Sequence, residues 1–247
     1  MNGIDVTERG RLVILAPAGE AKSLVSAQAL HDLSAFCDAV ATEERVLVVV
    51  LVIGASATGP ADATHAHGIH DALTKATKRL ANTPHVTIAA LDGNCIDHEL
   101  CLAIACDLRV AASDVQIGFP GVATAVVPDE LTVRRLTTMV GRTRAADLLL
   151  TGRTIVGTSA ADWGLVEEAA EEETAVARAE VLARVISDGA PLAMRYAKEA
   201  VDRGYRMRLD EGLGLEGDLY AILQTTADRM EGISAFQARR GPRYVGK

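Results

Sequence analysis

Runs of β-branched and aliphatic residues alternate with helical patterns in the first half of this 247-residue chain, and this alternation constrains its fold most. The run at residues 45–53 has the composition of a buried parallel strand, and residues 86–91 have it too. The predicted strands are residues 12–15, 45–53, 86–91, 107–111 and 115–119, and the helices predicted among them are 30–40 and 100–106. Such alternation predicts βα units and a largely parallel sheet.

Strand patterns nearly disappear after residue 129, and helical patterns replace them. The predicted helices are residues 129–140, 143–151, 173–188, 192–204 and 206–240. Pro191 separates two of them, and Gly212, Gly214 and Gly217 weaken the pattern of the last. We therefore expect an α/β first part followed by a helical second part.

Charge and aromatic content limit the partners of this chain. It has 33 acidic and 25 basic residues, a formal charge of -8, and only 3% aromatic residues. This balance argues against a broad nucleic-acid surface and against binding to an anionic membrane. Several acids form one run that predicts a solvated helix entry, where carboxylates stabilise the helix dipole: Glu167, Glu168, Glu171, Glu172 and Glu173.

The sequence indicates neither a membrane span nor an oxidising compartment. Its longest aliphatic run, residues 46–53, is far shorter than the roughly 20 residues of a membrane helix. The first residues, MNGIDVTERG, lack the pattern of a signal peptide. The cysteines, which form no C-x-x-C pair, are Cys37, Cys95, Cys101 and Cys106. Three of them lie among apolar residues, which is typical of reduced thiols, so we expect a soluble cytoplasmic protein.

Five stretches in this order resemble the crotonase (enoyl-CoA hydratase/isomerase) superfamily. They are VTIAALDGN (86–94), LAIACDLRVAASDVQIGFP (102–120), LLLTGRTIVGTSAADWGLVEE (148–168), APLAMRYAKEAV (190–201) and EGISAFQARRGPRYVGK (231–247). The resemblance implies an α/β fold, a crotonase-like ββα spiral followed by an α-helical C-terminal region. It places the spiral core in residues 1–190 and a region for trimerisation and CoA capping in residues 191–247. It also implies a homotrimer or homohexamer.

The family's chemistry uses two backbone N–H groups that stabilise an enolate at a thioester oxygen, each worth about 3–4 kcal/mol. The resemblance assigns the first donor to Gly59, in a stretch that also fits a plain turn. It assigns the second to the backbone of His98, where relatives have three glycines and this chain has Asp97, His98 and Glu99. These side chains either enter the site or have ordinary roles at a helix start: Asp97 as cap, Glu99 beside the dipole and His98 on the surface.

The two catalytic glutamates of the family's hydratases are absent, because their positions fall on Cys101 and Gly121. Asp129, with Glu130 beside it, resembles the aspartate that some isomerases of the family use. Asp129 after a proline also fits an ordinary helix N-cap. Alternatively, His98 held by a neighbouring acid is the general base, with Glu99 and Glu130 as assistants.

Basic residues near the C-terminus suit the phosphates of CoA. The last twelve residues carry four basic side chains and no acid, and arginine offers a planar, bidentate donor set to a phosphate. The CoA contacts that the resemblance implies are Lys22, Ala57, Ala61, Asp62, Phe236, Arg239 and Arg240. A solvated basic tail is the alternative.

These features predict action on a CoA thioester through an oxyanion-stabilised enolate, with isomerase-like or other non-hydratase chemistry. A catalytically silent acyl-CoA binder or assembly partner is the alternative, and a β-diketone C–C bond hydrolase of the same fold is a further one. No cofactor is expected beyond the CoA of the substrate. No metal is expected either, because His65, His67 and His70 lack the i, i+4 spacing of a helical metal site.

Overall fold

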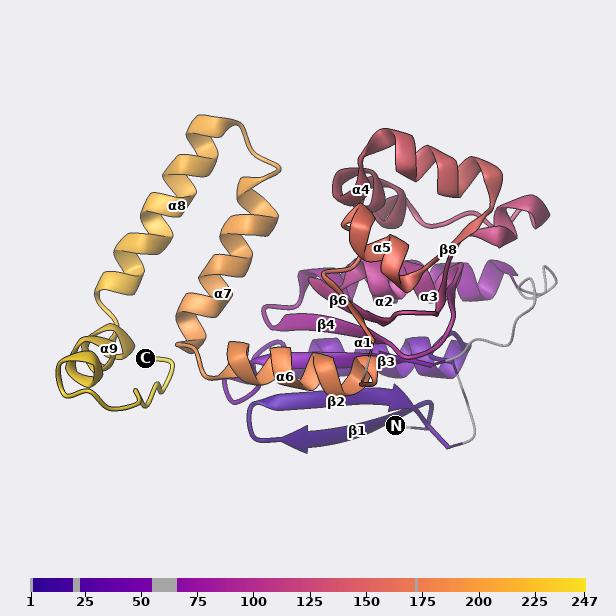
Figure 1. Ribbon diagram of the computed structural model, residues 1–247. Coiled ribbons are helices and arrows are strands. Elements are labelled where there is room, and N and C mark those ends of the chain that lie inside the picture. The colour runs from indigo at the N-terminus through magenta and orange to yellow at the C-terminus, as the bar shows by residue number, and fades with distance from the viewer. Residues whose placement is uncertain (1, 20–22, 55–65, 172) are drawn as a thin grey trace.

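The computed structural model describes residues 2–19, 23–54, 66–171 and 173–247, and Figure 1 shows a sheet flanked by helices with a helical arm beside it. Within these residues the main sheet has the strand order β1-β2-β3-β4-β6-β9. Its strands are β1 (Ile4–Arg9), β2 (Leu12–Pro17), β3 (Val48–Ile53), β4 (Val86–Leu91), β6 (Leu108–Ala112) and β9 (Glu168–Ala170). The first two pair antiparallel and all later neighbours pair parallel, which confirms the largely parallel sheet.

A small second sheet is formed by strands that follow β4 in the sequence. It joins β5 (Cys95–Ile96), β7 (Gln116–Gly118) and β8 (Thr154–Val156). The parallel pairing of β5 with β7 sets Ile96 opposite Gly118. The residues that follow these two strands therefore meet, although they are more than twenty positions apart.

Helices cover both faces of the main sheet, because its strands are apolar on both sides. One face packs against α1 (Ala27–Val40), α2 (Ala66–Asn82) and α3 (His98–Ala105). The other face packs against Ala175, Ala179 and Ala183 of α6 (Ala175–Ser187). Alanine at every fourth position keeps one side of α6 flat, so the helix lies close to the strands.

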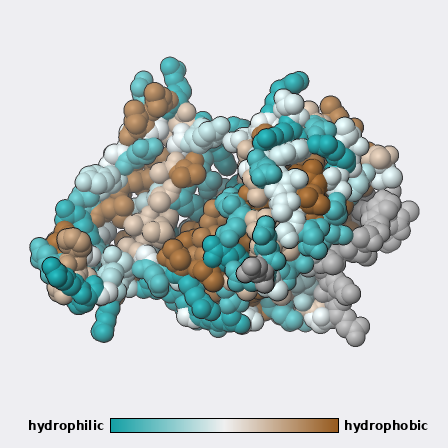
Figure 2. Space-filling view, in the orientation of Figure 1, coloured by the Kyte–Doolittle hydropathy of each residue, from teal (hydrophilic) through white to brown (hydrophobic). Residues whose placement is uncertain are grey.

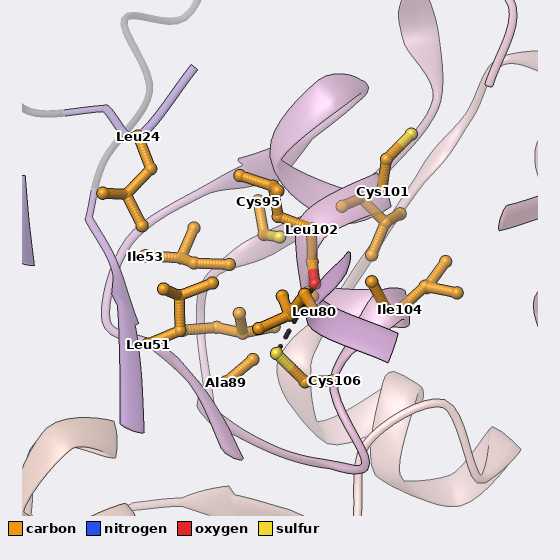
Figure 3. Close-up of a cluster of buried hydrophobic side chains, with 14 of the residues drawn as sticks. Leu24, Leu51, Ile53, Leu80, Ala89, Cys95, Cys101, Leu102, Ile104 and Cys106 are labelled. Carbon is orange, nitrogen blue, oxygen red and sulfur yellow. Dashed lines mark hydrogen bonds between the residues drawn. The ribbon is translucent and has the colours of Figure 1, made fainter. Parts of the chain in front are cut away.

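The core around α3 holds three of the four cysteines, Cys95, Cys101 and Cys106 (Figure 3). All four cysteines are free and buried, as predicted. Burial raises the pKa of Cys37, Cys101 and Cys106 to about 12, so these thiols stay protonated at neutral pH. In the part of the chain that the structure describes, no helix is long and apolar enough to cross a membrane.

Helices dominate the rest of the chain. They are α4 (Glu130–Thr151), α5 (Gly157–Trp163), α7 (Pro191–Glu199), the π-helical turn η3 (Ala200–Gly204), α8 (Leu209–Gln224) and α9 (Ala227–Gln237). The arm formed by α7 and α8 extends away from the sheet in Figure 1, and Figure 2 shows apolar residues over it. Its exposed apolar side chains include Val201, Leu209 and Leu213.

Several predicted boundaries were wrong for identifiable reasons. The prediction of two helices at 129–140 and 143–151 is confirmed in substance, since α4 bends at Gly141, whose φ is 79°. The single helix predicted for 206–240 is two, α8 and α9. Gly212 weakened that prediction, yet in α8 it allows close approach, since a Cβ there would lie 3.2 Å from the carbonyl oxygen of Gly204.

The acidic run does not form a helix entry. Residues 168–170 form strand β9, and helix α6 begins only at Ala175, capped by Thr174, with no acid in its first turn. Glu167 pairs with Arg109 and Glu168 pairs with Arg178. Strand β9 is three residues long and exists through its pairing with β6, so local sequence carries no strand signal there.

Candidate functional site

The start of helix α3 has an unusual backbone. Asp97, between β5 and α3, has φ 51° and ψ -110°, close to the first central residue of a type II′ turn, where glycine is the usual residue. Its N–H donates to the carbonyl oxygen of Gly118 at 3.0 Å, and its own carbonyl accepts from Cys101 N–H at 3.1 Å. Its side chain makes no capping bond to α3, so the predicted cap role of Asp97 is wrong.

The carboxylate of Asp97 instead crosses to the short helix η2 (Pro120–Thr124). Both of its oxygens accept from the N–H of Gly121, at 2.9 Å for Oδ1 and 3.2 Å for Oδ2. A Cβ at Gly121 would lie only 2.7 Å from Oδ2, so this arrangement requires glycine there. Burial raises the pKa of Asp97, and the Gly121 bond acts in the opposite direction.

His98 is the first residue of α3 and is only 8% exposed, so the prediction of a surface histidine is wrong. Burial lowers its pKa, and so does the nearby charge of His70, whereas Asp129 raises it. Among the described residues, neither its ring nitrogens nor its backbone N–H has a hydrogen-bond partner. The N–H groups that open a helix lack an acceptor within it, so this donor is available to a ligand.

Asp129 joins two helices. Its Oδ1 accepts from Thr132 N–H at 2.7 Å, which caps α4, and its Oδ2 accepts from the hydroxyl of Thr77 on α2 at 2.6 Å. The N-cap interpretation is therefore confirmed. Thr77 was not foreseen, because its contact spans 52 positions and nothing in the local sequence signals it.

Replacing Asp129 with alanine should lower the free energy of unfolding by about 2–4 kcal/mol, because α4 loses its cap and the buried Thr77 hydroxyl loses its bond to a carboxylate, keeping only the weaker one to the carbonyl oxygen of Thr74 at 3.1 Å. Thr174→Ala is the matched control: Thr174 is an exposed cap whose hydroxyl oxygen accepts from Ala177 N–H, so this change should cost about 1 kcal/mol. Urea denaturation measures both. Equal losses in the two variants would show that the Thr77 bond contributes nothing.

The other predicted proton carriers differ in exposure. Glu99 is fully buried on α3, while Glu130 lies exposed at the first position of α4. Cys101 is fully buried, and its raised pKa makes it a poor base or nucleophile. Lys22, Ala57, Gly59, Ala61, Asp62 and His65 lie outside the described residues. No group of three potential metal ligands occurs within residues 2–19, 23–54, 66–171 and 173–247.

The predicted CoA contacts on the last helix and directly after it lie apart from α3, since Figure 1 places α9 at the opposite side of the molecule. Phe236 is 86% exposed, and Arg239 is exposed beside it. Arg240 is engaged with Glu231, with Nη1–Oε1 at 2.6 Å and Nη2–Oε2 at 2.8 Å. This pairing lowers the pKa of Glu231 to about 2. One copy of the chain thus does not bring these residues to the start of α3.

Comparison with known proteins places the chain among relatives. The family model described as Enoyl-CoA hydratase/isomerase matches residues 25–247. Human enoyl-CoA hydratase domain-containing protein 2, mitochondrial, is 41% identical over 172 residues, which cover 68% of this chain and 59% of that protein. Mouse methylglutaconyl-CoA hydratase, mitochondrial, is 32% identical over 259 residues, covering 99% of this chain and 82% of that protein.

The fold has close structural neighbours. A crystal structure of an enoyl-CoA hydratase from Bacillus anthracis superposes with a TM-score of 0.91 at 27% identity, covering 99% of this chain and all of that one. The alignments with the first curated relatives span only about three fifths of their length, 58% to 62%.

Proposed function

The chain belongs to the enoyl-CoA hydratase/isomerase family, and from that premise we propose that it binds a CoA thioester and stabilises its enolate. The observation that carries this proposal is the backbone N–H of His98, which opens a buried helix and has no acceptor in the described part of the chain. A preorganised donor of this kind raises kcat by about 10²–10³-fold, because it binds the oxygen on which charge develops. Gly59 is the proposed second donor.

The reaction is proposed to be an isomerisation rather than a two-glutamate hydration. The family resemblance sets Cys101 and Gly121 at the positions of the hydratase glutamates, and neither residue type supplies a carboxylate. Moving a double bond of an enoyl thioester requires only removal of one proton and delivery of another to a different carbon. A 3-enoyl-CoA is therefore the proposed substrate class.

His98 fits the role of proton carrier better than Asp129. Both carboxylate oxygens of Asp129 already accept hydrogen bonds, from Thr132 and Thr77. The imidazole of His98 has no such engagement among the described residues, and its lowered pKa favours the neutral form, which can accept a proton. Asp129 then acts on His98 through its charge.

A CoA moiety whose thioester is bound at α3 of one copy is proposed to contact Phe236 and Arg239 of a neighbouring copy, since α9 lies far from α3 within one copy. Exposed apolar residues on the C-terminal helices support assembly into a trimer or a hexamer. Arg239 is the better phosphate ligand of the two adjacent arginines, because Arg240 is held by Glu231.

Arg239→Ala should weaken CoA binding about tenfold or more, the effect of losing one charge-assisted hydrogen bond to phosphate. Arg240→Ala should have a smaller effect. Isothermal titration with CoA and with dephospho-CoA measures both variants. If Arg239 contacts the 3′-phosphate, its replacement leaves dephospho-CoA binding unchanged; equal affinity of wild type and Arg239→Ala for CoA would contradict the assignment.

Turnover tests the function directly. The protein is incubated with crotonyl-CoA, a 3-enoyl-CoA and a dienoyl-CoA, and the absorbance of the conjugated thioester is followed. The proposal expects conversion of the 3-enoyl-CoA to its conjugated isomer. Binding of CoA thioesters without any turnover would favour a silent acyl-CoA binder, and absence of binding would favour a β-diketone substrate.

A further inference from the structure

We propose that the carboxyl group of Asp97 is a second proton-transfer group of this site, acting together with the imidazole of His98. This inference rests on the proposed function, because it assigns a role within the same isomerisation. Neither capping of α3 nor a salt bridge explains why an aspartate occupies position 97. Its side chain makes no capping bond, and its hydrogen-bond partner in the described chain is the N–H of Gly121.

The chain is built to hold this carboxyl group in place. Asp97 is 5% exposed and adopts a left-handed backbone conformation, with φ 51°, that is costly for a residue with a side chain. Gly121 leaves the space that the carboxylate fills, since a Cβ there would lie 2.7–2.9 Å from the three carboxylate atoms. A glycine at 97 would relieve the strain, and a larger residue at 121 would displace the carboxylate. Residues 97 and 121 therefore both allow a carboxylate to occupy this space, even though the carboxylate requires a strained backbone at residue 97.

His98 supplies the second observation. Its side chain is more than nine-tenths buried and makes no hydrogen bond within the described chain, although it follows Asp97 directly. Consecutive residues thus supply a buried, unengaged imidazole and a buried carboxyl group, a potential base and a potential acid, at a backbone donor that has no acceptor in the described chain. Titratable groups near this pair include His70 on α2, Asp129 at the start of α4, Cys101 on α3 and the buried Glu99, the next residue of α3.

The surroundings of the two groups shift their pKa values in opposite directions. Burial lowers the pKa of His98 and raises the pKa of Asp97, which are the directions that a base and an acid require, although the Gly121 bond acts against the second shift. His98 removes a proton from the α-carbon of a 3-enoyl thioester, and the electron pair of that C–H bond passes into the dienolate. Asp97 donates its proton to the γ-carbon as the electron pair returns to form the conjugated double bond. The substrate keeps its formula, and a proton exchanged with water resets the pair.

The test follows isomerisation of a 3-enoyl-CoA by the wild type and four variants, with butyryl-CoA binding and thermal unfolding measured for each. Asp97→Asn keeps the shape and an acceptor for Gly121 N–H but carries no exchangeable acid proton. It should bind butyryl-CoA within about threefold of wild type and lower kcat at least about 100-fold, the usual contribution of general acid–base catalysis. Gly121→Ala should also lower kcat, because its Cβ displaces the carboxylate.

Moving the carboxylate from residue 97 to residue 121 distinguishes a loss of catalysis from a loss of folding. Asp97→Gly removes the group, and Asp97→Gly/Gly121→Asp returns a carboxylate to the vacated space from the other side. The double variant should regain at least about tenfold in kcat over Asp97→Gly, since it restores a general acid at that point. If Asp97→Asn keeps both its butyryl-CoA affinity and its kcat within threefold of wild type, the proposed role of Asp97 is overturned while the proposed function stands. If Asp97→Asn fails to fold, absence of rescue in the double variant overturns it; a wild type without turnover overturns the proposed function as well.

Discussion

Replacing Arg109 with leucine should lower the free energy of unfolding by about 3–5 kcal/mol, because a buried guanidinium loses several hydrogen bonds, and a hydrogen bond to a charged group is worth about 1.5–3 kcal/mol. Arg109 lies on β6, is 2% exposed, and donates to the carbonyl oxygens of Leu165 at 2.7 Å and Cys106 at 2.9 Å. Its Nη2 also lies 2.7 Å from Oε1 of Glu167. The substitution therefore removes this donor from the carbonyl oxygen of Leu165 and leaves the carbonyl oxygen of Cys106 with the guanidinium of Arg135, 3.1 Å away.

Arg178→Leu is the matched control for this prediction. Arg178 pairs with Glu168, the neighbour of Glu167, but both side chains are more than one-third exposed. Exposed pairs contribute about 0–1 kcal/mol, so this variant should unfold almost as the wild type does. Urea denaturation with coincident fluorescence and circular dichroism transitions measures both. Similar losses for the two arginines would show that burial of Arg109 does not determine its contribution.

His98→Ala should lower kcat for the 3-enoyl-CoA by about 100-fold or more, because it removes the proposed base while leaving the backbone N–H of residue 98 in place. Affinity for butyryl-CoA should stay within about threefold, since the thioester oxygen is bound by the backbone. The same pair of measurements on Asp97→Asn gives a direct comparison of the two groups.

His31 offers the control, as an exposed histidine on α1. His31→Ala should leave both kcat and affinity unchanged. The pH dependence has a defined sign: because burial lowers the pKa of His98, its neutral form persists below the ordinary histidine pKa of about 6.5, and wild-type turnover should persist there too. Full activity in His98→Ala would move proton transfer to another group.

The strands and helices that could be predicted are those whose own residues favour them. The β-branched run of β3 and the apolar run of β4 are unambiguous, and so is the apolar spacing of α1. Strands β8 and β9 could not be predicted, because each has three residues and depends on pairing with a distant partner. Strand β1 was missed because only Ile4 among its residues is buried.

In the candidate site too, contacts between residues close in the sequence could be predicted and contacts between distant residues could not. The capping role of Asp129 was foreseeable, since a cap bonds to a residue three positions ahead. The role of Asp97 was not, because its partner Gly121 lies 24 positions away, and the contact follows from the pairing of β5 with β7. The sequence pointed to residues 97–99 but left two alternatives open, side chains that enter the site or ordinary roles as a cap, beside the dipole and on the surface. Burial and backbone conformation exclude the cap and the surface role.

The central claim is that the backbone N–H of His98 polarises a thioester carbonyl, and infrared spectroscopy tests it most directly. Butyryl-CoA labelled with ¹³C at the thioester carbonyl is bound to the protein, and the isotope difference spectrum isolates its carbonyl stretch. Hydrogen bonds from preorganised donors weaken the C=O bond, so the account predicts a band at lower wavenumber than in free butyryl-CoA. A bound ligand whose carbonyl band stays at the position seen in water, or at higher wavenumber, would contradict it.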